Sequence, residues 1–174
     1  MEFWKVLEER RSIREFDPDR GVDQEQVDRL LEAAILAPTA GDRQPWHFVV
    51  TSNPEVKETI VANALRQTFI ATAPVMIVVC GEPERSGARW GQMMADLHTI
   101  QDTSAAIENM LLAATSMGLS ACWVSALREE ELRVALKLPE NLRPLAIVPV
   151  GYAAKRPGAR PPRRPIKDVT TFIK

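Results

Sequence analysis

The segment from Pro74 to Cys80 constrains the fold more than any other part of this chain, because every one of its residues is apolar. A strand that faces water on one side alternates polar and apolar residues, whereas a strand covered by helices on both faces does not. We therefore expect residues 74–80 to form a central strand of a sheet that lies between helices. The mostly apolar stretch 69–80 is well short of the roughly 20 residues that cross a bilayer, so we expect no membrane span.

Helix and strand patterns alternate along the rest of the sequence. Asp23, with Gln26 three residues later, has the spacing of a capping box and predicts the start of a helix over residues 23–37. Residues 94–117 contain neither Gly nor Pro and predict a long central helix that ends at Gly118. The other expected elements are helices over residues 3–10, from 54 onward and over 128–137, strands over 46–51, 120–126 and 145–152, and a polar loop over 81–91.

These patterns predict one layered domain followed by an extension. The alternation is typical of an α/β or α+β domain, which we expect over residues 1–152. Within its last strand, Pro149 should bend the strand or place it at an edge. Residues 153–174 are proline-rich and basic, and we expect them to lie extended along a surface. A length of 174 residues is ordinary for one domain.

Charge and cysteine content narrow the class of protein. The 22 Lys and Arg residues nearly balance the 23 Asp and Glu residues, so there is no electrostatic reason to expect a nucleic acid or an anionic membrane as partner. The N-terminus lacks the basic start and apolar run of a signal peptide, and we expect a cytoplasmic protein. Cys80 and Cys122 lie in apolar stretches and are expected to be buried free thiols.

Several catalytic and binding motifs are missing from the sequence. It contains no G-x-G-x-x-G, no P-loop motif, no H-E-x-x-H and no C-x-x-C, so a Rossmann site, a P-loop and the common zinc sites lack support. Residues 118–122 do not make a G-x-S-x-G nucleophile elbow, because Cys122 replaces the second Gly. We interpret His47 and His98 as core or surface residues, and we expect no metal site.

The first segment with the composition of a binding site is the cluster of Arg10, Arg11, Ser12 and Arg14. Guanidinium groups provide paired donors that match a phosphate, so the cluster indicates an anion site. The alternative is that these arginines only cap the C-terminus of the first helix.

Two further segments indicate a binding site only when they are considered together with the arginine cluster. Residues 37–46 form a loop of small and polar residues whose backbone can approach a flat ligand, and its Asp42 and Gln44 can bond hydroxyls or ring nitrogens. Alone, it is merely a connection between a helix and a strand. The tail around Arg160, Arg163 and Arg164 would by itself be interpreted as a solvated charged segment.

Taken in order, the arginine cluster, the loop, the helix segment 102–114 and the Gly118-Leu119 pair before Cys122-Trp123-Val124 resemble the nitroreductase family of flavoenzymes. The resemblance extends from about residue 3 to 170. It implies an α+β fold with a mixed sheet wrapped by helices. It also implies a homodimer that binds FMN at the subunit interface.

The resemblance assigns roles to individual residues. In the family, the residues that match Arg10, Arg11, Ser12 and Arg14 hold the flavin phosphate and ribityl chain. The other residues implied at the cofactor are Pro38, Thr39, Ala40 and Asp42 from the partner subunit, Ser125 and Ala126 beside the isoalloxazine, Gln67 at the pyrimidine ring, and Arg163 or Arg164 at the phosphate. Asp42 stands where many members have Asn, and Gln67 is equally compatible with a helix-surface residue.

The implied activity is an oxidoreductase that needs no catalytic side chain. NADH or NADPH would deliver a hydride to N5 of FMN, and a nitroaromatic, quinone or similar small acceptor would then take the electrons in a ping-pong mechanism. Two alternatives remain open. One is specialised chemistry on the same fold, which degrades reduced flavin or removes halogen from tyrosine derivatives. The other is a flavin-binding module without turnover.

Overall fold

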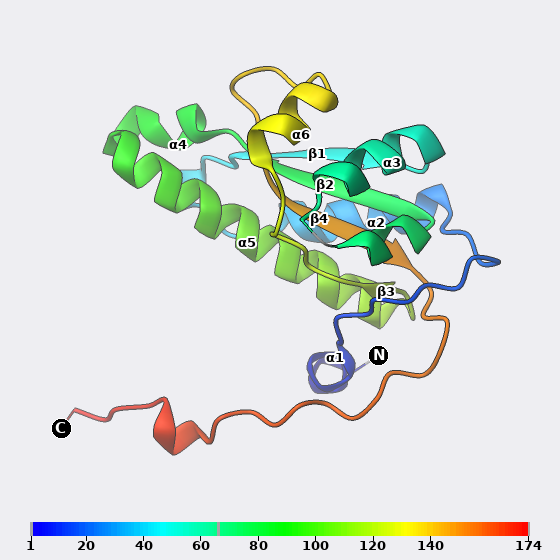
Figure 1. Ribbon diagram of the computed structural model, residues 1–174. Coiled ribbons are helices and arrows are strands. Elements are labelled where there is room, and N and C mark those ends of the chain that lie inside the picture. The colour runs from blue at the N-terminus through cyan, green and yellow to red at the C-terminus, as the bar shows by residue number, and fades with distance from the viewer. Residues whose placement is uncertain (1, 66, 174) are drawn as a thin grey trace.

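The computed structural model describes residues 2–65 and 67–173, and these contain a four-stranded sheet in the order β1-β2-β4-β3 (Figure 1). The strands are β1 (Trp46–Thr51), β2 (Val75–Gly81), β3 (Ser120–Ala121) and β4 (Arg143–Gly151). Neighbouring strands pair antiparallel, and a parallel bridge between Ser12 and Ala121 adds the N-terminal segment beside β3. The expected α+β class, a mixed sheet wrapped by helices, is confirmed.

Helices cover both faces of the sheet. Helices α2 (Gln24–Ile35) and α5 (Gln92–Ser116) lie on one face, and α3 (Pro54–Asn63) and α6 (Glu129–Ala135) lie on the other (Figure 1). Helix α4 (Pro83–Trp90) packs along the N-terminal half of α5, and α1 (Phe3–Glu9) lies beside its C-terminal half. All seven residues of β2 are buried, which confirms the prediction of a central strand.

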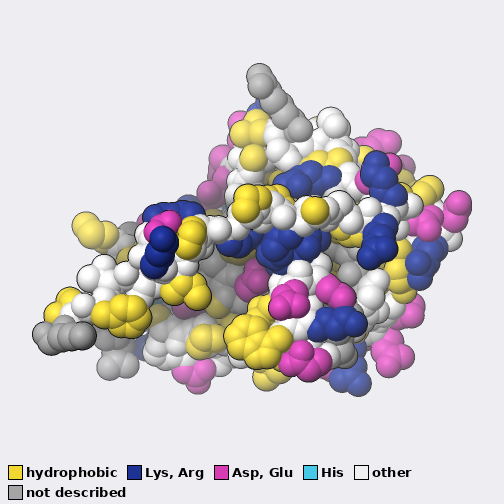
Figure 2. All heavy atoms as spheres, turned by 90° about the horizontal axis from the view of Figure 1, so that it is seen from below, with side chains coloured by type: hydrophobic (Ala, Val, Ile, Leu, Met, Phe, Trp, Pro, Cys, Tyr) yellow, Lys and Arg dark blue, Asp and Glu magenta, His cyan; other side chains and the backbone are white. Residues whose placement is uncertain are grey.

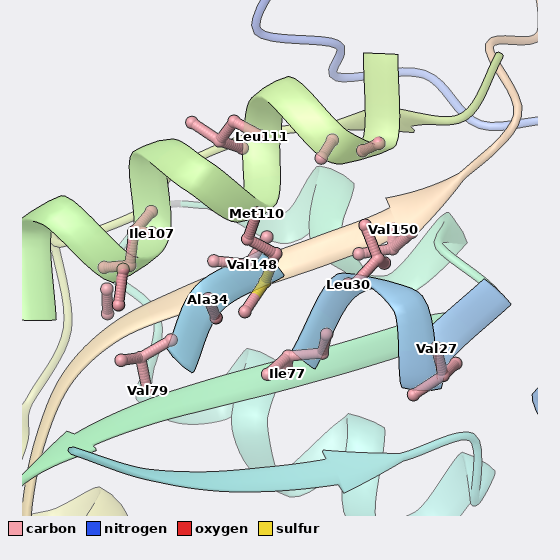
Figure 3. Packing of buried hydrophobic residues seen from close by; sticks show 14 of the residues in the cluster. Val27, Leu30, Ala34, Ile77, Val79, Ile107, Met110, Leu111, Val148 and Val150 are labelled. Atoms are coloured by element: carbon pink, nitrogen blue, oxygen red, sulfur yellow. The ribbon is translucent and has the colours of Figure 1, made fainter. Parts of the chain in front are cut away.

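Helix α2 shows how the sequence directs side chains into the larger core. Asp23 Oδ1 accepts a hydrogen bond from Gln26 N at 2.8 Å, and Gln26 Oε1 accepts one from Asp23 N at 3.2 Å, so the predicted capping box is confirmed. The cap sets the helix so that Val27, Leu30 and Ala34 point at the sheet (Figure 3). There they meet the apolar side chains that β2, β4 and α5 turn toward the same core.

The polar loop expected over residues 81–91 is wrong, because helix α4 occupies most of it. Pro83 stands in the first turn, where its missing N–H costs no helical hydrogen bond. The Ser86 side chain is buried, and its Oγ accepts a hydrogen bond from Thr99 Oγ1 at 3.1 Å. The segment is helical because it packs on α5, which its polar composition does not reveal.

The strand expected over residues 120–126 is also too long. Strand β3 has two residues, and it is followed by isolated bridges from Val124 to Ile147 and from Leu127 to Ala64. After Val124 the chain leaves β4 and bonds to the segment after α3, where Leu65 N donates to Ala126 O at 2.9 Å.

Pro149 does not place its strand at an edge, since β4 lies between β2 and β3. The carbonyl of Pro149 accepts a hydrogen bond from Cys122 N at 3.4 Å, which shows that the backbone of Pro149 faces β3 and not β2. The N and O atoms of one residue point to the same side of an antiparallel strand. The missing N–H of Pro149 therefore removes no hydrogen bond to β2.

Beyond Tyr152 the chain is extended except for the short 3-10 turn η3 (Ile166–Asp168), and it runs beneath α1 in the view of Figure 1. Its start is fixed by a hydrogen bond from Ala154 N to Glu15 O at 3.0 Å. Its end carries Phe172 and Ile173, which are 84% and 94% exposed. Across the described parts of the chain, no helix has the length and apolar character that a bilayer crossing requires.

Candidate functional site

The arginine cluster lies on an additional edge of the sheet. Helix α1 ends at Glu9, and the next residues run extended beside β3, where Ile13 N donates to Ala121 O at 3.0 Å. Farther along, Phe16 forms a bridge with Ala153 at the start of the tail. The N-terminal segment is therefore held between β3 and the tail, and its side chains are presented beside residues far away in the sequence.

This arrangement forms a cavity of about 220 Å³ that we call the basic cavity. Figure 2 shows Lys and Arg side chains gathered on this face of the molecule, beside the extended tail. The residues that line the basic cavity are Arg10, Arg11, Ser12, Arg14, Arg160, Pro161 and Arg163. Sequence residues from both ends of the chain are thus brought to one site.

Two of these arginines are bound to the C-terminus of α1. Arg160 Nη2 donates to the carbonyls of Leu7, Glu8 and Arg10 at 2.8, 3.0 and 2.8 Å. Arg11 Nη1 donates to the carbonyls of Glu8 and Arg10 at 2.6 and 3.0 Å. The helix-capping interpretation therefore holds for part of the cluster, and it joins the tail to the first helix.

The capping bonds leave donors and positive charge for a ligand. Arg11 Nε is buried and has no hydrogen-bond partner among the described residues. Burial, followed by the charges of Arg11, Arg163 and Arg10, lowers the pKa of Arg160, whereas Glu8 acts in the opposite direction. An anion in the cavity would accept a hydrogen bond from the unpartnered buried donor. It would also reduce the repulsion between the guanidinium groups.

Glu108 of α5 forms an ion pair with this cluster, with 3.7 Å between Arg10 Nε and Glu108 Oε1. Arg14 lies instead over an aromatic ring, with its guanidinium carbon 5.9 Å from the centre of Phe69. The two arginines are thus oriented by different elements, and neither contact uses all the donors of a guanidinium group.

Cys122 lies next to the cluster as a buried free thiol, as expected. Burial raises its pKa, while Arg14, a hydrogen bond with Ser12, and Arg10 act in the opposite direction. Cys80 lies deeper, and burial raises its pKa to about 12. Both thiols therefore stay protonated near neutral pH.

The structure places Gln67, Ser125 and Ala126 in one neighbourhood with Arg14. The bond between Leu65 N and Ala126 O joins the segment before η2 (Thr68–Thr72) to the chain after β3. Gln67 directly precedes η2, which carries the Phe69 ring beneath Arg14. Ser125 lines a second, mostly apolar cavity of about 290 Å³; the other residues that line it are Ile100, Thr103, Ser104, Ile107, Trp123, Leu145 and Ala146.

The loop with Pro38, Thr39, Ala40 and Asp42 lies elsewhere on the same protomer. It contributes to neither of these two cavities. Ala40 N donates to both carboxylate oxygens of Asp102, at 3.2 Å each, whereas the arginine cluster contacts α5 six residues farther along, or about 9 Å along the helix axis.

The two tail arginines named as alternatives differ in their surroundings. Arg163 lines the basic cavity, whereas Arg164 Nη2 donates to the carbonyl of Asp168 at 2.7 Å, within the tail. The geometry therefore favours Arg163 as the ligand-facing residue.

Sequence reasoning missed three contributors: the role of Arg160 at α1, the pairing of Glu108 with Arg10, and the bond between Asp102 and the loop. Arg160 was within the basic tail, so its composition was a usable signal. The two carboxylates lie on a helix whose position relative to the loop and the cluster is a tertiary property, and no local pattern reveals it.

Comparison with known proteins matches residues 7–68 and 59–152 to the model of the nitroreductase family. A protein of Methanothermobacter thermautotrophicus that bears the name NADH dehydrogenase/NAD(P)H nitroreductase is 37% identical over 166 residues, which cover 92% of this chain and 82% of that protein. An FMN reductase [NAD(P)H] of Bacillus subtilis is 30% identical over 188 residues, covering 97% of this chain and 74% of that protein.

Solved structures agree with the fold. A nitroreductase family protein of Clostridium difficile superposes with a TM-score of 0.85 at 30% identity and covers 99% of this chain and 98% of its own. A structure from Exiguobacterium sibiricum, described as a complex with FMN, gives a TM-score of 0.91 at 20% identity and covers 99% of this chain and 97% of its own.

Proposed function

The chain belongs to the nitroreductase family, and from this premise we propose that it is an NAD(P)H-dependent FMN oxidoreductase that delivers electrons to a nitroaromatic, quinone or similar small acceptor. The names of its relatives, an NAD(P)H nitroreductase and an FMN reductase, support the hydride donor and the cofactor. The finer points, namely the acceptor, the kinetic mechanism and the residues at the cofactor, are proposals that rest on the site.

The observation that carries the proposal is the basic cavity. A phosphate dianion is bound by several converging donors, and no described carboxylate lines this cavity although Glu108 pairs with Arg10 beside it. The cavity is lined by five arginines from two ends of the chain, and Arg11 Nε is a buried donor without a hydrogen-bond partner among the described residues. The absence of a glycine-rich pyrophosphate motif favours a single terminal phosphate, as in FMN, over FAD.

We assign roles on that basis. Arg10, Arg11, Ser12 and Arg14 bind the phosphate and ribityl chain, and Arg163 completes the phosphate site. Ser125, Ala126 and Gln67 would hold the ring of the cofactor; Ser125 and Ala126 are exposed, and Leu65 N donates to Ala126 O.

When bound, FMN would supply the hydride and electron chemistry, so the protein needs to bind and orient the ring more than to supply acids and bases. The contribution of this chain is to bind and orient the cofactor. Backbone N–H groups and arginines near the ring would stabilise the negative charge of the reduced flavin.

The proposal includes a second copy of the chain. Within one protomer, Pro38, Thr39, Ala40 and Asp42 lie away from the basic cavity, which supports the proposal that they reach the cofactor of a partner subunit. The N-terminal half of α5 offers an apolar surface for that partner, since Met93, Leu97 and Ile100 are 85%, 46% and 46% exposed. We also propose a cytoplasmic location.

Anaerobic titration tests this function. NADH or NADPH should bleach the yellow protein, and later addition of a quinone or nitroaromatic should restore the colour. Initial rates with varied donor and acceptor should give parallel double-reciprocal lines, the signature of a ping-pong mechanism. A flavin that neither nucleotide bleaches would contradict the proposal and favour a binding module. Bleaching without transfer to these acceptors would favour the specialised chemistries.

A further inference from the structure

The Pro38–Asp42 loop adopts a backbone conformation that needs external support. Gly41, Asp42 and Gln44 have φ angles of 63°, 56° and 49°. Two of these three residues are not glycine, and non-glycine residues in this region carry a conformational cost. Bonds between the loop and the residues just after it, such as Gln44 N to Thr39 Oγ1 at 3.2 Å, shape this segment but do not fix its position on the molecule.

Asp102 of α5 fixes that position. Both of its carboxylate oxygens lie 3.2 Å from Ala40 N, and the residue is 6% exposed. A buried carboxylate that accepts a backbone N–H makes a charge-assisted bond, which is stronger than a bond between neutral groups. A second tie, from Arg85 Nε to Arg43 O at 3.1 Å, comes from α4 and lies on the exposed side of the loop.

We propose that Asp102 is a positioning residue for cofactor binding, which holds the Pro38–Asp42 loop on α5 in the conformation that a second subunit presents to FMN. This inference rests on the proposed function and adds to it a residue that does not touch the cofactor. Asp102 and the exposed apolar residues Leu97 and Ile100 are on the same helix, so the residue that holds the loop and the surface proposed to meet the partner belong to one element.

The bond can be weakened at its acceptor or removed at its donor. Asp102→Asn is nearly isosteric and keeps one neutral acceptor but removes the charge. Ala40→Pro removes the donor, and the residue before it permits the change, since Thr39 has φ −134° and ψ 150°. Asp96→Asn is the matched control, because Asp96 is a carboxylate on the same helix that pairs with Arg143 at 2.9 Å, away from the loop.

FMN dissociation constants from fluorescence titration give the main result. We expect Asp102→Asn and Ala40→Pro each to weaken FMN binding by about three- to tenfold, which is the worth of one hydrogen bond. The double variant should bind no more weakly than the weaker single variant, because Ala40→Pro leaves no bond for Asp102→Asn to weaken. Asp96→Asn should stay within about twofold of the unaltered protein. The visible circular dichroism of bound flavin should change in the first two variants and not in the control.

A purely structural role predicts a different pattern. In that case the two variants would lower the thermal midpoint and leave FMN affinity and the flavin spectrum unchanged, and the inference would be wrong. Losses that multiply in the double variant would also overturn it. If the unaltered protein binds no FMN, the proposed function fails together with this inference; if it binds FMN and the variants bind it equally well, only this inference fails.

Discussion

Arg14 is the residue in the cluster whose described contact is with an aromatic ring rather than with backbone carbonyls or a carboxylate. Arg14 also lines the basic cavity. We therefore expect Arg14→Ala to weaken FMN binding about ten- to hundredfold, the worth of a charge-assisted hydrogen bond of about 1.5 to 3 kcal/mol. Flavin fluorescence titration measures the effect. Arg20→Ala is the control, since Arg20 stacks on Tyr152 at 3.5 Å. Equal affinities of the two variants would remove Arg14 from the site.

Arg163 and Arg164 provide a second test with a built-in control. They are neighbours in sequence and carry the same charge, but only Arg163 lines the basic cavity, while Arg164 bonds the carbonyl of Asp168. Arg163→Ala should weaken FMN binding by about tenfold or more, and Arg164→Ala should leave it nearly unchanged. The comparison should be repeated at two salt concentrations, because a general electrostatic effect would be screened equally in both variants. The reverse order of affinities would exchange their roles.

At the scale of elements, the tail residues 153–174 connect the site to the first helix. Arg160 binds three carbonyls at the C-terminus of α1, and Arg163 follows three residues later. A protein that ends at Tyr152 should therefore lose FMN affinity and dimer stability together, because α1 loses its cap and the cavity loses one wall. Flavin titration and sedimentation measure the two properties. Full affinity in a dimeric truncated protein would make the tail a solubilising appendage.

The sequence predicted a helix or strand correctly where the residues of that element, or those next to it, determine its type and its ends. The apolar run in β2, the box of Asp23 and Gln26 before α2, and Gly118 after α5 each act locally, and each was found. Helix α4 was not, since its polar residues form a helix against α5 and bury Ser86 there. The end of β3 was also missed, because the chain after Val124 bonds to the segment after α3.

In the candidate site, too, the features formed within one segment were predictable and the contacts between distant segments were not. Clustered arginines and a proline-bounded loop are visible in a sequence, and the family resemblance placed both at a cofactor. The bond from Asp102 to Ala40 and the bonds from Arg160 to α1 join residues 62 or more positions apart. Such bonds depend on how helices pack on the sheet, and no pattern in one segment encodes them.

At the scale of the whole molecule, large apolar side chains are exposed on two described parts of the surface. On α5, Met93, Leu97 and Ile100 are exposed, and Phe172 and Ile173 are almost fully exposed on the tail. We expect a homodimer that covers them. Sedimentation equilibrium at micromolar concentration should give twice the chain mass of 19.4 kDa, and Leu97→Glu should reduce it. A single chain mass for the unaltered protein would contradict the proposed dimer.

The cofactor itself is the most direct test of the account. The purified protein, after incubation with a mixture of FMN and FAD and removal of the excess, should be heat-denatured and its supernatant separated by chromatography. The basic cavity predicts FMN at about one molecule per chain, because its arginines suit one terminal phosphate. Recovery of FAD, or of no flavin at all, would contradict the central claim.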